Sequence, residues 1–252
     1  MRTLIFGDIH GGLKSLEQVL QLAKVAKEDK LIFLGDYVDR YPESFGVIEK
    51  LISLSRTNEC VFIRGNHDQW FLEFLQSDIS NRIWSTTGGS ETIKSYKGKG
   101  YSKIEEHTNF LEKTSLYYTQ NNMLFVHGGF TNSNSIFKEP HESNFYWDRT
   151  LWESASLLHE VLEYNREFVN IPKRFTLFDR IFIGHTCTLN SGKDSPITCY
   201  NVTNLDTGGG FVNGRLTCYS LDDETYYRSD RMSQLYPDVT SGSVNYFNHN
   251  KN

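Results

Sequence analysis

The sequence is poor in three features that would assign it to a special class of protein. Its four cysteines include no C-x-x-C pair, and we expect all four to be reduced. No apolar run approaches the roughly 20 residues that a membrane-spanning helix requires. The formal net charge is -5, which argues against nucleic-acid binding through overall positive charge, although a local basic patch is compatible with it. We therefore expect neither membrane association nor stable nucleic-acid binding.

The chain also lacks a leader segment before its first predicted strand. It enters an apolar run at Arg2, and with residue 1 as the natural start this predicts a cytoplasmic protein. Hydrophobic residues at 38% and charged residues at 23% are ordinary for a soluble globular protein. The length of 252 residues suits one large catalytic domain as readily as two small domains.

What the sequence does contain is a recurring arrangement in which an apolar, strand-like run ends in a short polar cluster. The arrangement occurs five times, with GDIHG at 7–11, GDYVDR at 35–40, RGNHD at 64–68, HGG at 127–129 and GHT at 184–186. Chance is a poor explanation for such repetition. Because the candidate ligands run from Asp8 to His185, a boundary between them would divide the site. We therefore predict one domain over residues 1–240.

The first third of the chain alternates strands with helices. Apolar residues recur at helical spacing over 13–23 and 45–54, between the first three strand-like runs. This alternation predicts an α/β fold with parallel strands and helical crossovers. In such sheets ligands gather beyond the carboxyl ends of the strands, which is where Asp8, Asp36 and Asn66 would lie.

The rest of the chain has a less regular pattern. Glycines punctuate residues 77–122, which we interpret as a cap or insertion near the site, with a short helix over 103–113. The end of the chain, 241–252, is predicted to be a flexible tail. The remaining elements are predicted from periodicity: a helix over 147–164, and short strands that favour an antiparallel arrangement in a second sheet over 197–202, 215–221 and 225–228.

The clusters offer Asp, His and Asn side chains without thiolates, a ligand set that suits hard or borderline divalent ions. Two ions about 3.5–4 Å apart, bridged by an aspartate, bind phosphate oxygens and deliver a bridging hydroxide for in-line attack. Arg40 and Arg64 lie within the clusters, where they would stabilise the negative charge of phosphoryl transfer. His67 can serve as an acid, and Asp39 is a candidate to orient it.

Together the five ordered motifs resemble the calcineurin-like metallophosphoesterase superfamily, and more closely its phosphoprotein phosphatase branch, over about residues 2–221. The resemblance implies a β-sandwich of two mixed sheets flanked by helices, in αββα order. It also implies two divalent ions, with manganese expected and iron or zinc as alternatives. The implied ligands are Asp8, His10 and Asp36 at one ion, with Asp36 bridging to a second ion held by Asn66, His127 and His185.

The same resemblance assigns roles to residues that act on the substrate. It implies that His67, paired with Asp39, protonates the leaving group. It further implies that Arg40 and Arg64 are phosphate ligands. The predicted reaction is single-step hydrolysis, without a phosphoenzyme.

Three further positions have competing interpretations. Arg149 lies on a segment similar to the W-x-R segment of compact family members, which implies phosphate binding, but an ion pair with Glu153 at helical spacing is the alternative. Tyr41 stands where the family usually has glycine, at the expected rim of the pocket. Asp68 stands where glutamate is frequent, and a helix-capping role is favoured over catalysis.

The leading functional interpretation is a dinuclear metal-dependent phosphatase acting on phosphoserine, phosphothreonine or phosphotyrosine in proteins, or on small phosphoesters. The alternative is a symmetrical diadenosine tetraphosphate hydrolase. Enzymes of that type share GNHD, but they commonly have alanine at the position of Asp39 and lack arginine at that of Arg64. A non-catalytic scaffold on the same fold is a third interpretation, which the presence of His67 and of the complete ligand set disfavours.

Overall fold

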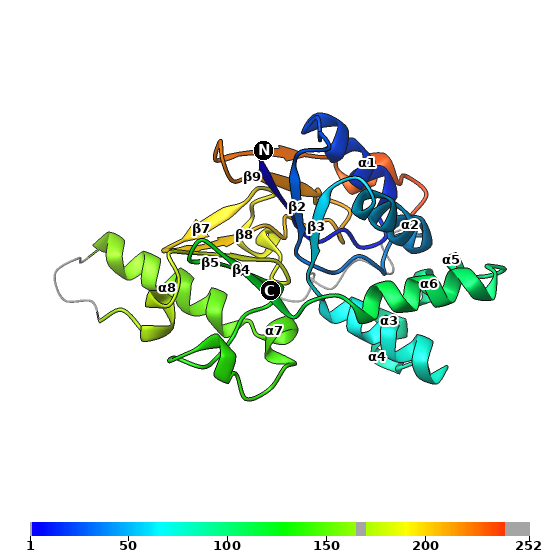
Figure 1. Cartoon of the computed structure of the whole chain (residues 1–252). Helices are drawn as coiled ribbons and strands as arrows, with labels where there is room; N and C mark the ends of the chain where they lie inside the picture. Colours follow the sequence, from blue (N-terminus) through cyan, green and yellow to red (C-terminus); the bar gives the residue numbers. More distant parts are fainter. Residues whose placement is uncertain (1, 165–169, 240–252) are drawn as a thin grey trace, which may run out of the picture.

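The computed structural model describes residues 2–164 and 170–239, and these form two β-sheets packed face to face with helices on the outer faces (Figure 1). The layers run helix, sheet, sheet, helix. This order confirms the α/β sandwich of αββα type that the sequence predicts. The tail predicted at 241–252 lies outside the described residues.

The first sheet contains five strands in the order β10-β9-β1-β2-β3. The first three strands of the chain run parallel, and β9 pairs antiparallel with both β1 and β10. Helices α1 (Leu13–Leu22) and α2 (Ser44–Ser55) provide the predicted crossovers. The strands are β1 (Thr3–Phe6), β2 (Lys30–Phe33), β3 (Glu59–Phe62), β9 (Thr217–Ser220) and β10 (Thr225–Arg228).

The second sheet has the order β4-β5-β6-β8-β7. Its three central strands run parallel, and the two edge strands are antiparallel to their neighbours. Helix α8 (Thr150–Tyr164) packs on the outer face through Leu151, Ala155 and Leu158. The strands are β4 (Tyr117–Gln120), β5 (Met123–Val126), β6 (Arg180–Ile183), β7 (Ile197–Cys199) and β8 (Val202–Asn204).

Side chains along the central strands alternate between the layer that separates the sheets and the outer layers. Ile5 and Ile32 of the first sheet share a buried cluster with Phe125 and Phe182 of the second. The two phenylalanine rings stack with centroids 5.2 Å apart. Their sequence neighbours face the helices instead, so both faces of each sheet are covered, as parallel strands require.

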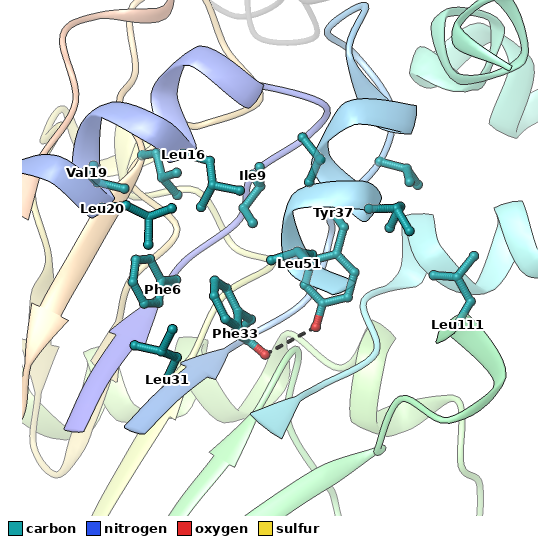
Figure 2. Packing of buried hydrophobic residues seen from close by; sticks show 14 of the residues in the cluster. Phe6, Ile9, Leu16, Val19, Leu20, Leu31, Phe33, Tyr37, Leu51 and Leu111 are labelled. Carbon is teal, nitrogen blue, oxygen red and sulfur yellow. Dashed lines mark hydrogen bonds between the residues drawn. The ribbon is translucent and has the colours of Figure 1, made fainter. Parts of the chain in front are cut away.

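Figure 2 shows the layer between the first sheet and its helices. Phe6 and Phe33 stack with ring centroids 4.6 Å apart, and Leu16 and Val19 of α1 lie over them. Tyr37, just beyond β2, belongs to the same cluster, and its hydroxyl donates to the carbonyl of Phe33 at 3.4 Å, drawn as a dashed line (Figure 2). The loop that follows β2 is thereby tied to the sheet.

We expect Phe182→Ala to lower the free energy of unfolding by about 3–5 kcal/mol, because it empties a fully buried position between the sheets. Phe137→Ala is the matched control, since that ring is 78% exposed, and it should change stability by less than about 0.5 kcal/mol. Urea unfolding followed by circular dichroism measures both variants. Equal losses in the two variants would contradict a core between the sheets.

The helix predicted over 147–164 is interrupted. A short helix, α7 (Asn144–Trp147), ends before α8 begins. Between them Asp148 has extended backbone, and its carboxylate accepts hydrogen bonds from the backbone N–H groups of Thr150 and Leu151 at 3.1 and 3.0 Å. The aspartate therefore caps a new helix, a local signal that helical periodicity does not reveal.

The strand predictions near the C-terminus are partly wrong. The run 197–202 contains parts of two strands rather than one, because the chain reverses at Tyr200, which has left-handed backbone with φ of 53°. β7 and β8 belong to the second sheet, as predicted. β9 and β10, in contrast, complete the first sheet.

Residues 77–122 are largely helical. Helix α6 corresponds to the helix predicted over 103–113, and in Figure 1 α3, α4, α5 and α6 gather on one side of the sandwich. The elements of this region are α3 (Asn66–Ser77), α4 (Arg82–Trp84), a π-helical turn (Ser85–Gly89), α5 (Ser90–Ser95) and α6 (Tyr101–Glu112).

The remaining helical elements are short. They are the 3-10 turns Ile136–Lys138, Lys173–Thr176 and Thr188–Ser191, and helix α9 (Met232–Leu235). All four cysteines are free thiols. None of the helices in the described part of the chain has both the length and the apolar character needed to span a membrane.

Candidate active site

The six predicted metal ligands converge where the carboxyl ends of strands from both sheets meet. The imidazole Nε2 of His127 lies 3.4 Å from Asp36 Oδ1, and the backbone N–H of His185 donates to Asp8 Oδ2 at 3.1 Å. All six side chains are buried. By strand, the ligands are Asp8 and His10 after β1, Asp36 after β2, Asn66 after β3, His127 after β5 and His185 after β6.

Left-handed backbone is concentrated at this convergence. His10, Asp36, Asp39, Arg40 and His185 have φ between 51° and 78°. Each such conformation costs a non-glycine residue on the order of 1 kcal/mol or more, and it persists only where surrounding contacts fix it. One such contact is the carbonyl of Asp36, which accepts the backbone N–H of His10 at 2.8 Å. Strain of this kind is typical of functional sites.

Two glycines allow the ligand loops to approach each other closely. A Cβ atom on Gly65 would collide with Asp36 Oδ1, and one on Gly184 would collide with Asp8 Oδ1. Both glycines belong to the sequence clusters, and any side chain at either position would displace a carboxylate ligand. Glycine is therefore required at both positions for a steric reason, the close approach of the ligand loops.

Hydrogen-bond acceptors face one another around His127. Its Nδ1 donates to the carbonyl of Leu34 at 2.9 Å, which leaves Nε2 as the nitrogen that faces the site. That nitrogen lies 3.1 Å from Asn66 Oδ1 and 3.4 Å from Asp36 Oδ1. Burial lowers the pKa of His127, but the charges of Asp36 and Asp8 outweigh it and raise this pKa to about 9. An imidazole nitrogen, an amide oxygen and a carboxylate oxygen this close together require a proton or a metal cation between them. This arrangement fits a divalent ion.

A second group of acceptors lies on the other side of Asp36. His10 Nδ1 is 3.3 Å from the carbonyl of Val38, so that its Nε2 faces Asp36 Oδ2 at 3.5 Å. Ligand-type atoms of His10, Asp36 and His67 all lie within 4.8 Å of one another, as do those of Asp8, Asp36 and His127. Asp36 thus belongs to both groups and presents a different oxygen to each, as a bridging ligand would.

The electrostatics of the site also favour bound cations. Burial raises the pKa of Asp8 well above its usual value, and the neighbouring carboxylate of Asp206 raises it further. Burial lowers the pKa of His185 well below its usual value, and its Nε2 is buried without a hydrogen-bond partner among the described residues. Clustered carboxylates and a neutral imidazole with a free nitrogen are satisfied together by divalent ions, so the donor set fits such a centre.

Next to these ligands, His67 and Asp39 form a buried pair. His67 Nδ1 lies 2.6 Å from Asp39 Oδ2, and the two side chains are 5% and 0% exposed as residues. His67 is also among the residues that line a cavity of about 230 Å³. A histidine whose Nδ1 is held by a carboxylate presents Nε2 to a substrate, the arrangement expected of an acid.

Arg40 and Arg149 also line this cavity. Arg40 stacks over the ring of Phe211 at 4.6 Å, and its Nε and Nη1 are buried without hydrogen-bond partners in the described part of the chain. Arg149 Nη1 donates to the carbonyl of His185 and to Thr186 Oγ1 at 3.1 and 3.2 Å. Two guanidinium groups at one cavity suit an anion such as phosphate.

Arg64, in contrast, is not brought to the cavity. Its Nη2 donates to the carbonyls of Leu111 and Glu112 in the last turn of α6, each at 3.1 Å. Its Nε and Nη1 bind Thr114 Oγ1 and Gln69 Oε1 at 2.9 and 3.0 Å. A cation at a helix C-terminus satisfies free carbonyls. In this structure Arg64 therefore stabilises the end of α6, and its predicted contact with phosphate stays a prediction.

Asp68 and Tyr41, the two departures from the family pattern, both have structural explanations. Asp68 Oδ2 accepts the backbone N–H groups of Gly65 and Asp36 at 2.9 and 2.8 Å, so it caps α3 and joins two ligand loops. Burial, followed by the charge of Asp36, raises its pKa to about 7. Tyr41 is fully buried against Tyr236, with ring centroids 4.8 Å apart, and so does not form the rim of the cavity.

Sequence reasoning missed several residues of the site. Asp206 lines the cavity and follows β8 within the run Asn-Leu-Asp-Thr-Gly, a sixth polar cluster at a strand end. Trp84 and Thr92 lie in the region interpreted as a cap, and both donate hydrogen bonds to Asp39. Asp206 could have been found, because it follows a strand-like run as the other clusters do. Trp84 and Thr92 have no local sequence signal.

The chain is similar in sequence to known phosphoesterases. Residues 1–189 match the family model described as calcineurin-like phosphoesterase. Serine/threonine-protein phosphatase 2 of Escherichia coli strain K12 is 29% identical over 224 residues, which cover 86% of this chain and 91% of that protein. An asymmetrical bis(5'-nucleosyl)-tetraphosphatase of Oceanobacillus iheyensis is 24% identical over 241 residues, covering 90% and 91%.

Solved structures share the fold. The crystal structure of a metallophosphoesterase from Sphaerobacter thermophilus aligns with a TM-score of 0.57 at 18% identity, covering 97% of this chain and 99% of that one. The likeness extends over the whole sandwich, so the arrangement of the two sheets is shared with a known phosphoesterase.

Proposed function

The chain belongs to the calcineurin-like phosphoesterase family, and we propose that it is a metal-dependent phosphatase acting on phosphoserine, phosphothreonine or phosphotyrosine in proteins. Two relatives are named as serine/threonine-protein phosphatases, and the match with this chain covers most of the length of each. Small phosphomonoesters that fit the same cavity are also proposed substrates.

The observation that supports this proposal most strongly is the His67–Asp39 pair beside Arg40. His67 Nδ1 is held at 2.6 Å by a buried carboxylate, and Arg40 has two buried nitrogens without partners among the described residues. A phosphomonoester needs both features, because its phosphoryl oxygens carry negative charge and its leaving oxygen requires a proton.

Members of this family use a dinuclear metal centre. Here Asp8, His10 and Asp36 would hold one ion, and Asp36 with Asn66, His127 and His185 would hold the other. When bound, such ions neutralise phosphate charge and activate water for in-line attack. Oxygen and imidazole ligands without thiolates would accept manganese, iron or zinc. We propose manganese from the family resemblance.

Side chains of the protein then bind the phosphoryl group and protonate the leaving oxygen. Arg40 and Arg149 bind and orient the phosphoryl oxygens. His67 donates its Nε2 proton to the leaving oxygen while the phosphorus–oxygen bond breaks. Asp39 holds Nδ1 and keeps its negative charge throughout, which stabilises the protonated imidazole.

Hydrolysis of dinucleoside tetraphosphates is a second candidate. The tetraphosphatase relative from Oceanobacillus iheyensis covers 90% of this chain. Trp70 and Trp147 line the cavity with ring centroids 4.8 Å apart, a surface on which a base can stack. Asp39 favours the phosphatase over a symmetrical tetraphosphatase, because enzymes of the symmetrical type commonly have alanine there. A non-catalytic scaffold is disfavoured by the complete set of ligands and by His67.

Initial rates with manganese on a phosphoserine peptide, a phosphotyrosine peptide and diadenosine tetraphosphate test the proposal. We expect the peptides to be preferred and His67→Asn to lower kcat on them by about 10²-fold. The exposed His141→Asn is the matched control and should retain the wild-type rate. Preferential cleavage of the dinucleotide would replace the proposal with the second candidate, and its products would show whether cleavage is symmetrical.

A further inference from the structure

Asp39 lies in the loop after β2, and both of its carboxylate oxygens accept hydrogen bonds from one helical segment. We define it as the Trp84–Thr92 segment, the part of the chain from the end of α4 into α5. Trp84 Nε1 donates to Asp39 Oδ2 at 2.7 Å, the same oxygen that pairs with His67 Nδ1 at 2.6 Å. Thr92 Oγ1 donates to Oδ1 at 2.6 Å.

The hydrogens around Asp39 can be assigned without conflict. Thr92 has one hydroxyl proton, and the carboxylate requires it, so Thr92 Oγ1 acts as an acceptor toward its other neighbours. These neighbours are the backbone N–H of Asp39 at 2.8 Å and the hydroxyl of Ser44 at 2.9 Å. Asp39 is therefore surrounded by donors from three different elements, and all of these residues are fully buried.

Packing fixes the position of the tryptophan. Trp84 is 0% exposed and contacts Phe71 and Phe74 of α3, with ring centroids 6.1 and 5.2 Å away. Helix α3 begins at Asn66, so the helix that carries His67 in its first turn also supports the indole. The histidine and the group that holds its partner thus share one rigid support.

The same segment also reaches the neighbouring arginine. The carbonyl of Gly88 accepts the backbone N–H of Arg40 at 3.3 Å, and a Cβ atom on Gly88 would press on the Arg40 backbone. Gly88 has φ of 125°, outside the helical region, and it forms a kink between the helical pieces that carry Trp84 and Thr92.

We propose that Trp84 and Thr92 are positioning residues for the acid His67, and that they act through Asp39. This inference rests on the proposed phosphatase function and assigns a role to the region interpreted from sequence as a cap. The segment completes the proton-donating machinery by restricting the carboxylate to the orientation in which Oδ2 faces His67 Nδ1.

The chemistry of the leaving group makes this role measurable. In hydrolysis, water supplies the hydroxyl group that joins phosphorus and releases its other proton to solvent, the phosphorus–oxygen ester bond breaks, and the proton on His67 Nε2 passes to the departing oxygen. A proton from solvent then restores His67. Asp39 remains an anion. A departing nitrophenolate is stable without that proton, whereas a departing phenolate is much less so. Misplacing His67 therefore slows phenyl phosphate far more than 4-nitrophenyl phosphate.

The closing experiment compares kcat and KM for these two substrates in Trp84→Phe and Thr92→Val. We expect kcat for phenyl phosphate to fall about 10- to 100-fold, with KM unchanged and 4-nitrophenyl phosphate within about 3-fold of wild type. Thr92→Ser keeps the hydroxyl and should restore the rate. Trp152→Phe, a buried tryptophan change on α8 away from Asp39, is the matched control.

A double-mutant cycle with Asp39→Asn tests whether Trp84 acts on His67 through Asp39. Once Asp39 is changed, Trp84→Phe should cause no further loss, because its effect passes through the carboxylate. Equal losses on the two substrates, or additive losses in the cycle, would overturn the inference and leave a purely structural role. Should Trp84→Phe fold poorly, the comparison of Thr92→Val with Thr92→Ser decides alone.

A proton NMR measurement separates this inference from the function on which it rests. The Nδ1 proton of His67, identified by its disappearance in His67→Asn, should move upfield in Thr92→Val whether or not the protein hydrolyses either substrate. An unmoved resonance would refute the positioning role. Wild-type protein that hydrolyses no phosphomonoester would refute the proposed function alone.

Discussion

Asp36→Asn will remove bound divalent ions and lower kcat by about 10³-fold or more, the largest effect we expect from a single substitution. Asp36 belongs to both groups of ligand-type atoms, and its two oxygens face His10 and His127 separately at 3.5 and 3.4 Å. Asparagine keeps the shape but supplies one neutral oxygen, so neither group retains its central anion. Elemental analysis of the purified variant, together with rates at saturating manganese, measures the loss.

The matched control is Asp238→Asn, since Asp238 is exposed and lies on the C-terminal side of α9. It should retain the metal content and the rate of the unchanged protein. An Asp36→Asn protein that still carries two ions per chain would disprove the bridging role, whatever its activity.

Arg40→Ala will lower kcat/KM by about 10²- to 10³-fold, because it removes a charged donor aimed at the developing negative charge. Arg64→Ala should leave kcat/KM within about 3-fold of wild type and instead lower the free energy of unfolding by about 1.5–3 kcal/mol, since it abandons the carbonyls at the end of α6. Steady-state kinetics and urea unfolding of the two variants make the comparison. A kinetic defect in Arg64→Ala as large as that in Arg40→Ala would restore Arg64 as a phosphate ligand.

The convergence of the candidate ligands could be predicted from the sequence because its signal is partly local. Each strand end is marked by an apolar run, and parallel strands bring their carboxyl ends to one edge of a sheet, which places Asp8, Asp36 and Asn66 together. His127 follows β5 of the second sheet, so its place beside them was implied by the family resemblance instead. The sandwich itself followed from the family resemblance, and the alternation of Ile5 and Phe182 into one layer agrees with it.

Features that depend on distant contacts could not be predicted in the same way. Arg64 lies two residues beyond β3, and its direction is decided by the end of α6, which the sequence places more than forty residues later. Trp84 and Thr92 lie on two helical pieces separated by the kink at Gly88, and both donate hydrogen bonds to Asp39 in the loop after β2. The assignment of β9 to the first sheet likewise depends on pairing with β1.

The pairing of β1 with β9 has a consequence for how the protein is made. Leu4 is synthesised more than 200 residues before its partner Ser220. Until β9 is synthesised, one edge of β1 has no hydrogen-bonding partner in this sheet. The last candidate ligand, His185, and the cavity residue Asp206 both precede β9 in the chain, so the site residues are all synthesised before the first sheet can be completed. Divalent ions that bind only the finished arrangement then favour its completion by mass action.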